Sequence, residues 1–316
     1  MALLHAAFVF LAGLTLMDRS GHVLSTPDFE EAGPFSMGLA RVRTDGVWGY
    51  ADESGRTVIA ARFRNASDFH ESLAAVEIDA GWGFIDTRGE WAIPARFRAV
   101  RDFADGRALV QVDDLWGYVD TKGTLVVPPR FPVAHSFTEG LAAVKDGERW
   151  GFIDLDGAWV IPPRLADAKP FAEGLAAAEL DGGWGHVDRS GRPAYTARHS
   201  ETFAFTGGLA RALVGEKWGW IDKTGAFVIE PIYVGADDFA EGRAPVKVGH
   251  NYGYVDTEGQ LVIPVQFDGC SGFSQGLASG HLNDKVRFFD RSGRLMFDTE
   301  YEQATPFVSD RAWVRR

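Results

Sequence analysis

The sequence predicts an all-β protein made of tandem 34-residue repeats, about nine units of three short antiparallel strands, in an open superhelical, solenoid-like array. Three observations support this prediction. Trp-Gly pairs recur every 34 residues, an Asp-x-x-Gly motif recurs with the same period, and so does a phenylalanine. No insertion or deletion breaks the phase of the three sets, which chance does not produce.

The tryptophans of the Trp-Gly pairs form the first set, called here the Trp column: Trp48, Trp82, Trp116, Trp150, Trp184 and Trp218. At the next two steps Tyr252-Gly253 and Val286-Arg287 stand in its place. The aspartates of the second set are Asp18, Asp52, Asp86, Asp120, Asp154, Asp188, Asp222, Asp256 and Asp290. The phenylalanines of the third set are Phe35, Phe69, Phe103, Phe137, Phe171, Phe205, Phe239, Phe273 and Phe307.

Each unit contains three β-like runs, which in the unit of residues 39–72 lie near 39–44, 47–52 and 56–61. Asp45-Gly46 separates the first two runs and "DESG" the next two, and both are hairpin signals. Prolines such as Pro94 follow the third run, where a missing N–H is tolerated. Helical repeats of the same period exist, but these turns and alternating runs indicate strands.

The ends of the chain also follow the period. Asp18 and Gly21 fall on the repeat grid, so residues 14–316 are predicted to form a single array, with residues 1–13 as an apolar cap or the remnant of a signal. Arg311 to Val314 match only the first strand of a further unit. This half-unit leaves an open array and a closed β-propeller as alternatives. The open array is favoured because propellers usually have about 4–8 blades.

The motif W-G-[YF]-[IV]-D-x-x-G resembles the hallmark of the WG-repeat (KWG-like) family of bacterial and some eukaryotic proteins. The resemblance extends from about residue 14 to Val314, and several columns recur in fixed phase. It implies a non-catalytic β-repeat array.

Within this pattern the glycine beside each tryptophan is interpreted as a packing device. It removes a side chain where a neighbouring backbone or indole must approach closely. The tryptophan could then bury about 150–250 Å² against the adjoining unit.

Composition excludes some functions. The net charge is −12 with a pI near 5.1, so the chain lacks the basic surface that a nucleic-acid binder needs. The apolar start from Ala2 to Met17 is too short for a membrane span. Cys270 is the only cysteine, which fits the cytoplasm; a periplasmic or secreted location remains open if the N-terminal segment is a signal.

No motif for catalysis or for metal or cofactor binding is found, so we expect neither a cofactor nor an enzyme. The eight histidines lack metal-ligand spacing, and Cys270 occupies an ordinary connector position. Each Asp-x-x-Gly offers one dependable carboxylate, which a turn explains without calcium.

Candidate binding residues come from a second aromatic column: Tyr50, Phe84, Tyr118, Phe152, His186, Trp220, Tyr254 and Phe288. Two alternatives are open, burial of this column or an exposed aromatic stripe. The unit of residues 175–208 departs most from the pattern. If function lies at such departures, His186, Trp220 and Tyr254 are predicted to contact a partner.

The predicted function is that of a non-enzymatic scaffold for protein–protein binding, with an inhibitor or immunity-type binder of a basic partner as one example. The alternative is an envelope or secreted glycan-binding module, which the aromatic column and the apolar start would suit.

Overall fold

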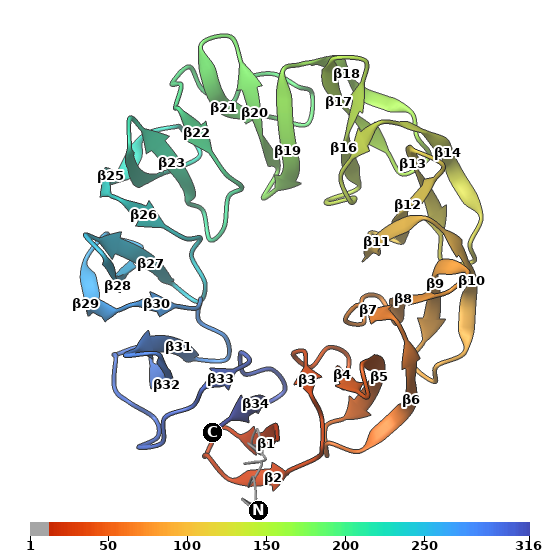
Figure 1. Ribbon diagram of the computed structural model, residues 1–316. Coiled ribbons are helices and arrows are strands. Elements are labelled where there is room, and N and C mark those ends of the chain that lie inside the picture. The colour runs from red at the N-terminus through yellow and green to blue at the C-terminus, as the bar shows by residue number, and fades with distance from the viewer. Residues whose placement is uncertain (1–12) are drawn as a thin grey trace, which may run out of the picture.

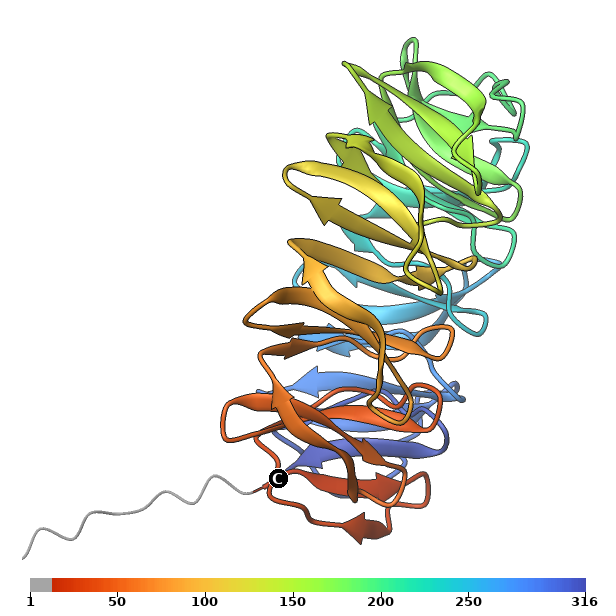
Figure 2. The same ribbon diagram turned by 90° about the vertical axis from the view of Figure 1, so that its right-hand side faces the viewer.

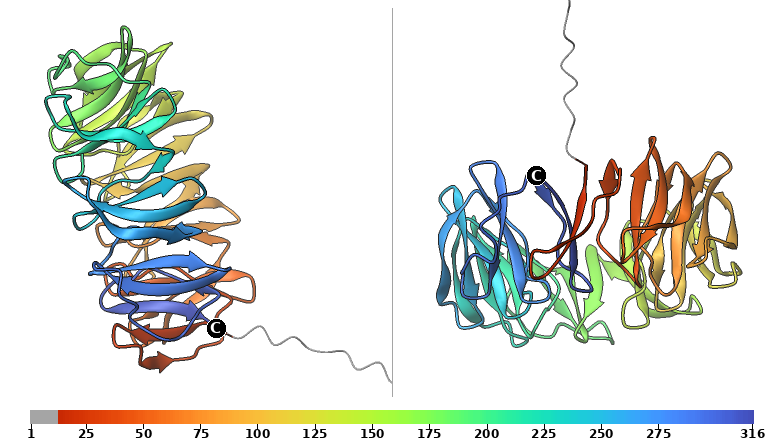
Figure 3. Two further views of the ribbon diagram at one scale, coloured as in Figure 1. Left: turned by 90° about the vertical axis from the view of Figure 1, so that its left-hand side faces the viewer. Right: turned by 90° about the horizontal axis from the view of Figure 1, so that it is seen from below.

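The protein folds into a closed ring of β-sheets, seen in a computed structural model that describes residues 13–316. Within these residues nine antiparallel sheets are arranged as the blades of a propeller around a central axis (Figure 1). Figure 2 and Figure 3 show the ring from its edges, with successive blades packed face to face. No helix that could cross a membrane occurs in the described part of the chain.

Each blade is a meander whose strands run outward from the centre of the ring. The inner strands are β3 (Glu31–Ala32), β7 (Asn65–Ala66), β11 (Ala99–Ala104), β15 (Val133–Ala134), β19 (Asp167–Ala172), β22 (Glu201–Thr202), β26 (Gly235–Ala236), β30 (Gly269–Cys270) and β33 (Gln303–Ala304). The second strands are β4 (Leu39–Thr44), β8 (Leu73–Ile78), β12 (Arg107–Val112), β16 (Leu141–Asp146), β20 (Leu175–Leu180), β23 (Ala210–Val214), β27 (Arg243–Val248), β31 (Leu277–Leu282) and β34 (Arg311–Arg315).

The third strands are β1 (Thr15–Asp18), β5 (Val47–Asp52), β9 (Gly81–Asp86), β13 (Leu115–Asp120), β17 (Arg149–Asp154), β21 (Gly183–Val187), β24 (Lys217–Ile221), β28 (Asn251–Asp256) and β32 (Lys285–Asp290). The outer strands are β2 (Val23–Ser25), β6 (Thr57–Phe63), β10 (Trp91–Phe97), β14 (Leu125–Phe131), β18 (Trp159–Leu165), β25 (Phe227–Tyr233) and β29 (Leu261–Phe267). Most units therefore have four strands rather than three, because the connector after the outer strand supplies the inner strand of the next blade.

The expected open array is wrong, and the closed propeller is correct. The terminal strand β34 pairs with β1 over four residues, from Thr15 opposite Val314 to Asp18 opposite Arg311. The half-unit at the C-terminus thus supplies the inner and second strands of the blade to which β1 and β2 belong. Completing this blade pairs strand edges that an open array would leave bare. The short inner strands explain how 34 residues suffice for a blade.

The turn motifs act as predicted. In the Asp-Gly hairpin both Asp45 and Gly46 have positive φ, 51° and 78°, as a type I′ turn requires. In the next turn Oδ1 of Asp52 accepts hydrogen bonds from the backbone N–H groups of Ser54 (2.9 Å) and Arg56 (3.1 Å). Gly55 has φ of 81° there, so the motif needs its glycine.

The glycine of the Trp-Gly pair lies where the outer strand of the same blade crosses it. A Cβ on Gly117 would lie 2.5 Å from the carbonyl oxygen of Val127 and 2.6 Å from the nitrogen of Pro129. The close neighbour is thus the blade's own outer strand. Arg287 replaces this glycine in the blade of β30, β31 and β32, and there residues 295–301 make only isolated bridges to β32. At Gly117 an added side chain would collide with the crossing strand.

The core lies between blades. Tyr50, Ile59 and Phe63 of one blade pack against Phe69 and Val76 of the next, in a cluster of buried residues. Of the predicted N-terminal segment, residues 1–12 lie outside the described chain. Thr15–Asp18 form β1 at the expected position, and Leu14 before it and Leu16 within it are buried.

Candidate binding site at the ring closure

The Trp column shows what an ordinary unit places between two blades. Trp48 packs against the cluster that contains Ala66 of the following blade. A cationic or aromatic side chain of the same blade lies near several of these rings: Arg41 lies 5.4 Å from the centroid of Trp48, Lys169 lies 4.6 Å from that of Trp184, and His135 stacks on Trp150 at 5.2 Å. We call the space filled by each column side chain an indole slot.

Two adjacent indole slots at the ring closure hold no aromatic residue. Val286 stands in the column in one blade, and Leu14 stands in it in the next blade around the ring. Both side chains are buried, with 2 % and 6 % exposure. Because valine and leucine are much smaller than tryptophan, the slots above them are not filled.

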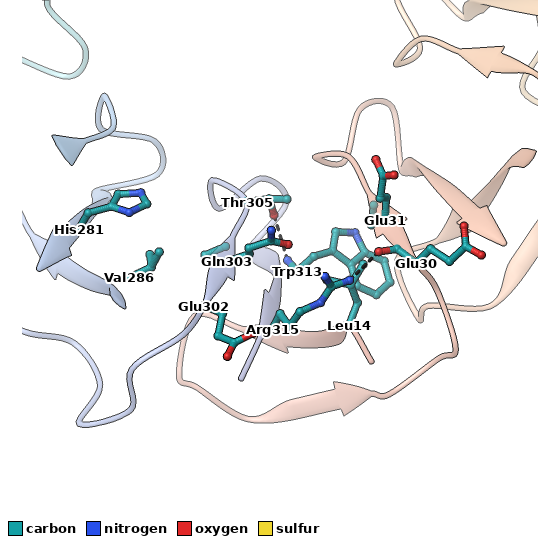
Figure 4. A pocket seen from close by; sticks show the side chains of 12 residues that line it. Leu14, Glu30, Glu31, His281, Val286, Glu302, Gln303, Thr305, Trp313 and Arg315 are labelled. Carbon is teal, nitrogen blue, oxygen red and sulfur yellow. Dashed lines mark hydrogen bonds between the residues drawn. The ribbon is translucent and has the colours of Figure 1, made fainter. Parts of the chain in front are cut away.

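A cleft of about 620 Å³ occupies these two slots. We call it the closure cleft; its apolar wall is formed by Leu14, Ala32, Val286, Ala304 and Trp313. Figure 4 shows Val286 and His281 on one side, Leu14 and Glu31 on the other, with Gln303 and Arg315 between them. The volume lies within the range of small-ligand pockets, about 300–1,000 Å³.

The polar rim of the closure cleft consists mainly of paired charges. Glu31 forms an ion pair with Arg43 at 2.5 Å, and Glu302 forms one with Lys285 at 3.6 Å. Nη2 of Arg315 donates to the carbonyl oxygen of Glu30 at 2.6 Å. The carboxylates are therefore largely neutralised by neighbouring cations. The exposed imidazole of His281 completes the rim.

Buried polar atoms at the cleft are also unsatisfied. The indole nitrogen of Trp313 and Nε of Arg315 have no hydrogen-bond partner within residues 13–316. Trp313 is 1 % exposed and stacks on Phe35 at 5.7 Å, so its indole is fixed in the wall. A buried donor without a partner is uncommon in folded proteins.

The three residues that sequence analysis singled out lie elsewhere, in the core. His186, Trp220 and Tyr254 are 0 %, 1 % and 0 % exposed. Of the two alternatives for their column, burial is correct and the exposed stripe is wrong, because each side chain packs against the phenylalanine of the next blade, as Trp220 does against Phe239 at 5.4 Å. These side chains do not form a contact surface.

His186 takes the place of a tyrosine in this column. The Tyr50 hydroxyl donates to the carbonyl oxygen of Ser67 at 2.7 Å, and Nε2 of His186 donates to the equivalent carbonyl of Phe203 at 2.8 Å. Nδ1 then accepts a hydrogen bond from the Tyr195 hydroxyl at 2.6 Å. Burial lowers the pKa of His186 to about 4, so the ring is neutral at pH 7. Its departure from the pattern has a structural explanation.

Cys270 is half-buried on the inner strand β30. Burial raises the pKa of its thiol to about 11, which disfavours the reactive thiolate. The closure cleft was missed by sequence analysis, although its signal was visible as Leu14 and Val286 in the Trp column.

The model of the WG containing repeat matches nine consecutive segments from residue 15 to residue 316, namely 15–48, 48–80, 82–116, 116–150, 150–184, 184–218, 218–250, 252–279 and 287–316. No curated protein matches.

Solved structures resemble the chain in fold. A eukaryotic initiation factor has a TM-score of 0.58 at 12% identity, covering 96% of this chain and 98% of that one. BamB from Moraxella catarrhalis has a TM-score of 0.47 at 12% identity, covering 96% and 97%. Hsv2p from Kluyveromyces lactis has a TM-score of 0.46 at 9% identity, covering 72% and 92%. At such identities the first likeness shows the fold alone.

Proposed function

This chain belongs to the family of proteins with WG containing repeats, and from that premise we propose that it is a non-enzymatic scaffold that binds another protein at the closure cleft. The observation that carries the proposal is the interruption of the Trp column by Val286 and Leu14, which leaves a cleft where ordinary units have an aromatic residue. The ring offers a rigid frame, since successive blades share buried clusters.

The partner is expected to carry a basic surface around the segment that enters the cleft. The chain has a net charge of −12, and opposite charge speeds encounter and suppresses unsuitable partners. Two rim carboxylates of the cleft, Glu31 and Glu302, are paired with Arg43 and Lys285. The charge therefore supports attraction at long range, and the cleft supports the specific contact. The alternative of a glycan-binding module depended on an exposed aromatic column, so we do not propose it.

Site-specific photocrosslinking tests the proposal. A benzophenone side chain is introduced at Gln303, which is exposed and lines the cleft, and separately at Asn65, the equivalent exposed position in an ordinary blade. In cells of the source organism we expect one defined adduct at Gln303 that is absent at Asn65. Mass spectrometry then identifies the partner, and adduct formation with the purified partner should fall as salt is added.

Crosslinking of the same partner with equal yield at Gln303 and Asn65 would mean that the partner does not bind preferentially at the closure cleft. Absence of any adduct at Gln303, under conditions where the chain is expressed and folded, would contradict the proposal in the same way.

A further inference from the structure

We infer that the closure cleft receives an aromatic side chain, preferably an indole, from the bound partner. The inference rests on the proposed function and adds the chemical class of the group that is recognised. The ring contains six tryptophans in equivalent slots, so its own structure shows which group such a slot accommodates.

The walls of the cleft are the same positions that surround the column tryptophans. Ala32 and Ala304 occupy the position of Ala66, which belongs to the cluster against which Trp48 packs. Thr305 occupies the position of His135, which stacks on Trp150. The two alanines thus repeat the apolar wall of an indole slot, whereas Thr305 puts a smaller side chain where His135 stacks on Trp150.

In the last aromatic unit before the closure a basic side chain faces the ring, and basic residues occupy the same position in the next two units. Lys247 lies 5.2 Å from the ring centroid of Tyr252, and the equivalent positions at the closure are His281 and Arg315. An aromatic face in the cleft can therefore gain a cation–π contact, which is stronger for tryptophan than for the other aromatic residues.

The carboxylates of the rim do not reverse this preference. Glu31 is paired with Arg43 and Glu302 with Lys285, so a cationic ligand would have to compete with cations already in place. An indole presents one N–H donor and a large apolar surface, which suits an apolar wall with accessible acceptors on its rim. Aromatic anchors of this kind commonly dominate the energy of protein interfaces.

Fluorine NMR of a fluorinated indole tests the inference with the whole chain. We expect saturable line broadening of this probe, displaced by N-acetyl-tryptophanamide and not by N-acetyl-lysinamide or N-acetyl-leucinamide. Restoring the column with Val286→Trp should weaken binding by about tenfold or more, because the slot is then filled from within. Leu125→Ala, at an exposed site on the outer strand β14, should leave binding unchanged.

Leu14→Trp fills the second slot and serves as an independent variant if Val286→Trp fails to fold, as judged by circular dichroism. Undiminished binding to a folded filled variant, or displacement by the lysine amide as effective as by the tryptophan amide, would overturn the inference. The two proposals can fail separately. If a partner crosslinks at Gln303 but the indole probes do not bind, the protein-binding function stands and the indole preference is wrong. If the indole probe binds but no partner crosslinks at Gln303, the cleft is an aromatic-binding site and the protein-binding function is wrong.

Discussion

Nε of Arg311 donates a hydrogen bond to the carbonyl oxygen of Glu53 at 2.7 Å, although 258 residues separate the two in sequence. The same bond joins Arg107 to Leu155 at 3.1 Å, with a separation of 48 residues. A full turn of the ring is nine units of 34 residues, or 306 residues. A separation of 258 residues along the chain therefore equals 48 residues when it is counted through the closure. The hydrogen bond between Arg311 and Glu53 at the closure is therefore equivalent to the hydrogen bond that joins neighbouring blades elsewhere in the ring.

Arg311→Ala is expected to destabilise the protein about as much as Arg107→Ala, by about 1–3 kcal/mol for a lost hydrogen bond from a charged donor. The reason is that both guanidinium groups are mostly buried and donate to a backbone carbonyl of the neighbouring blade. Urea unfolding of the two variants checks this. If Arg311→Ala has no effect while Arg107→Ala is destabilising, the ring is not closed in solution.

Gly117→Ala is expected to destabilise by about 3 kcal/mol, because the added methyl meets the crossing backbone of β14. Gly185→Ala is the matched control, since the blade of β19, β20 and β21 has no regular outer strand and the nearest atom to a Cβ there is Nη1 of Arg198 at 3.2 Å. Its cost should stay below about 1 kcal/mol. Thermal unfolding followed by circular dichroism measures both. Similar losses in the two variants would contradict the crossing.

Much of the fold followed from the sequence because the repeat keeps several columns in one phase. The turn residues marked the hairpins, and the half-unit at Arg311 was the signal for closure. The inner strands were missed because two residues, such as Asn65 and Ala66, carry no alternation. Closure itself depends on the small rotation between successive blades, which no single residue encodes.

The candidate site was harder to predict because both faces of a blade are buried. Alternation along a strand then cannot separate an exposed column from a core column. His186 was selected because it breaks a column, yet it makes the hydrogen bond of the tyrosine it replaces. Val286 replaces an aromatic residue of the Trp column by a smaller side chain and so opens a cleft. This kind of departure from the repeat was more informative than the one at His186, which keeps the hydrogen bond of the residue it replaces.

Glu139→Ala is expected to cost about 1 kcal/mol, whereas Glu139→Gln should be close to neutral. The Glu139 carboxylate accepts the N–H of Gly174 in the next blade at 3.0 Å. At the equivalent position Gln275 accepts the N–H of Asp310 at 2.9 Å, so an amide oxygen already performs this role in the ring. Urea titration at neutral pH gives the comparison. A large loss in Glu139→Gln would show that the charge, rather than the acceptor, stabilises the contact.

The buried His186 should make stability depend on pH between neutrality and about pH 4. An unfolded histidine takes up its proton near about pH 6.5, whereas burial lowers the pKa of His186 in the folded chain to about 4. Over this range the unfolded state binds more protons, so folding stability falls as pH falls, by on the order of 3 kcal/mol in total. The double variant His186→Tyr with Tyr195→Ile copies the pair Tyr50 and Ile59 and removes the titrating group.

Urea unfolding of the parent and of this double variant at about pH 7 and about pH 4.5 tests the assignment. Carboxylates that lose stability in acid are common to both proteins, so the difference between them isolates the histidine. We expect the parent to lose more stability than the double variant, and the gap to close as pH rises. Parallel losses in the two proteins would show that His186 is already protonated in the folded state, or that acid opens the ring elsewhere first.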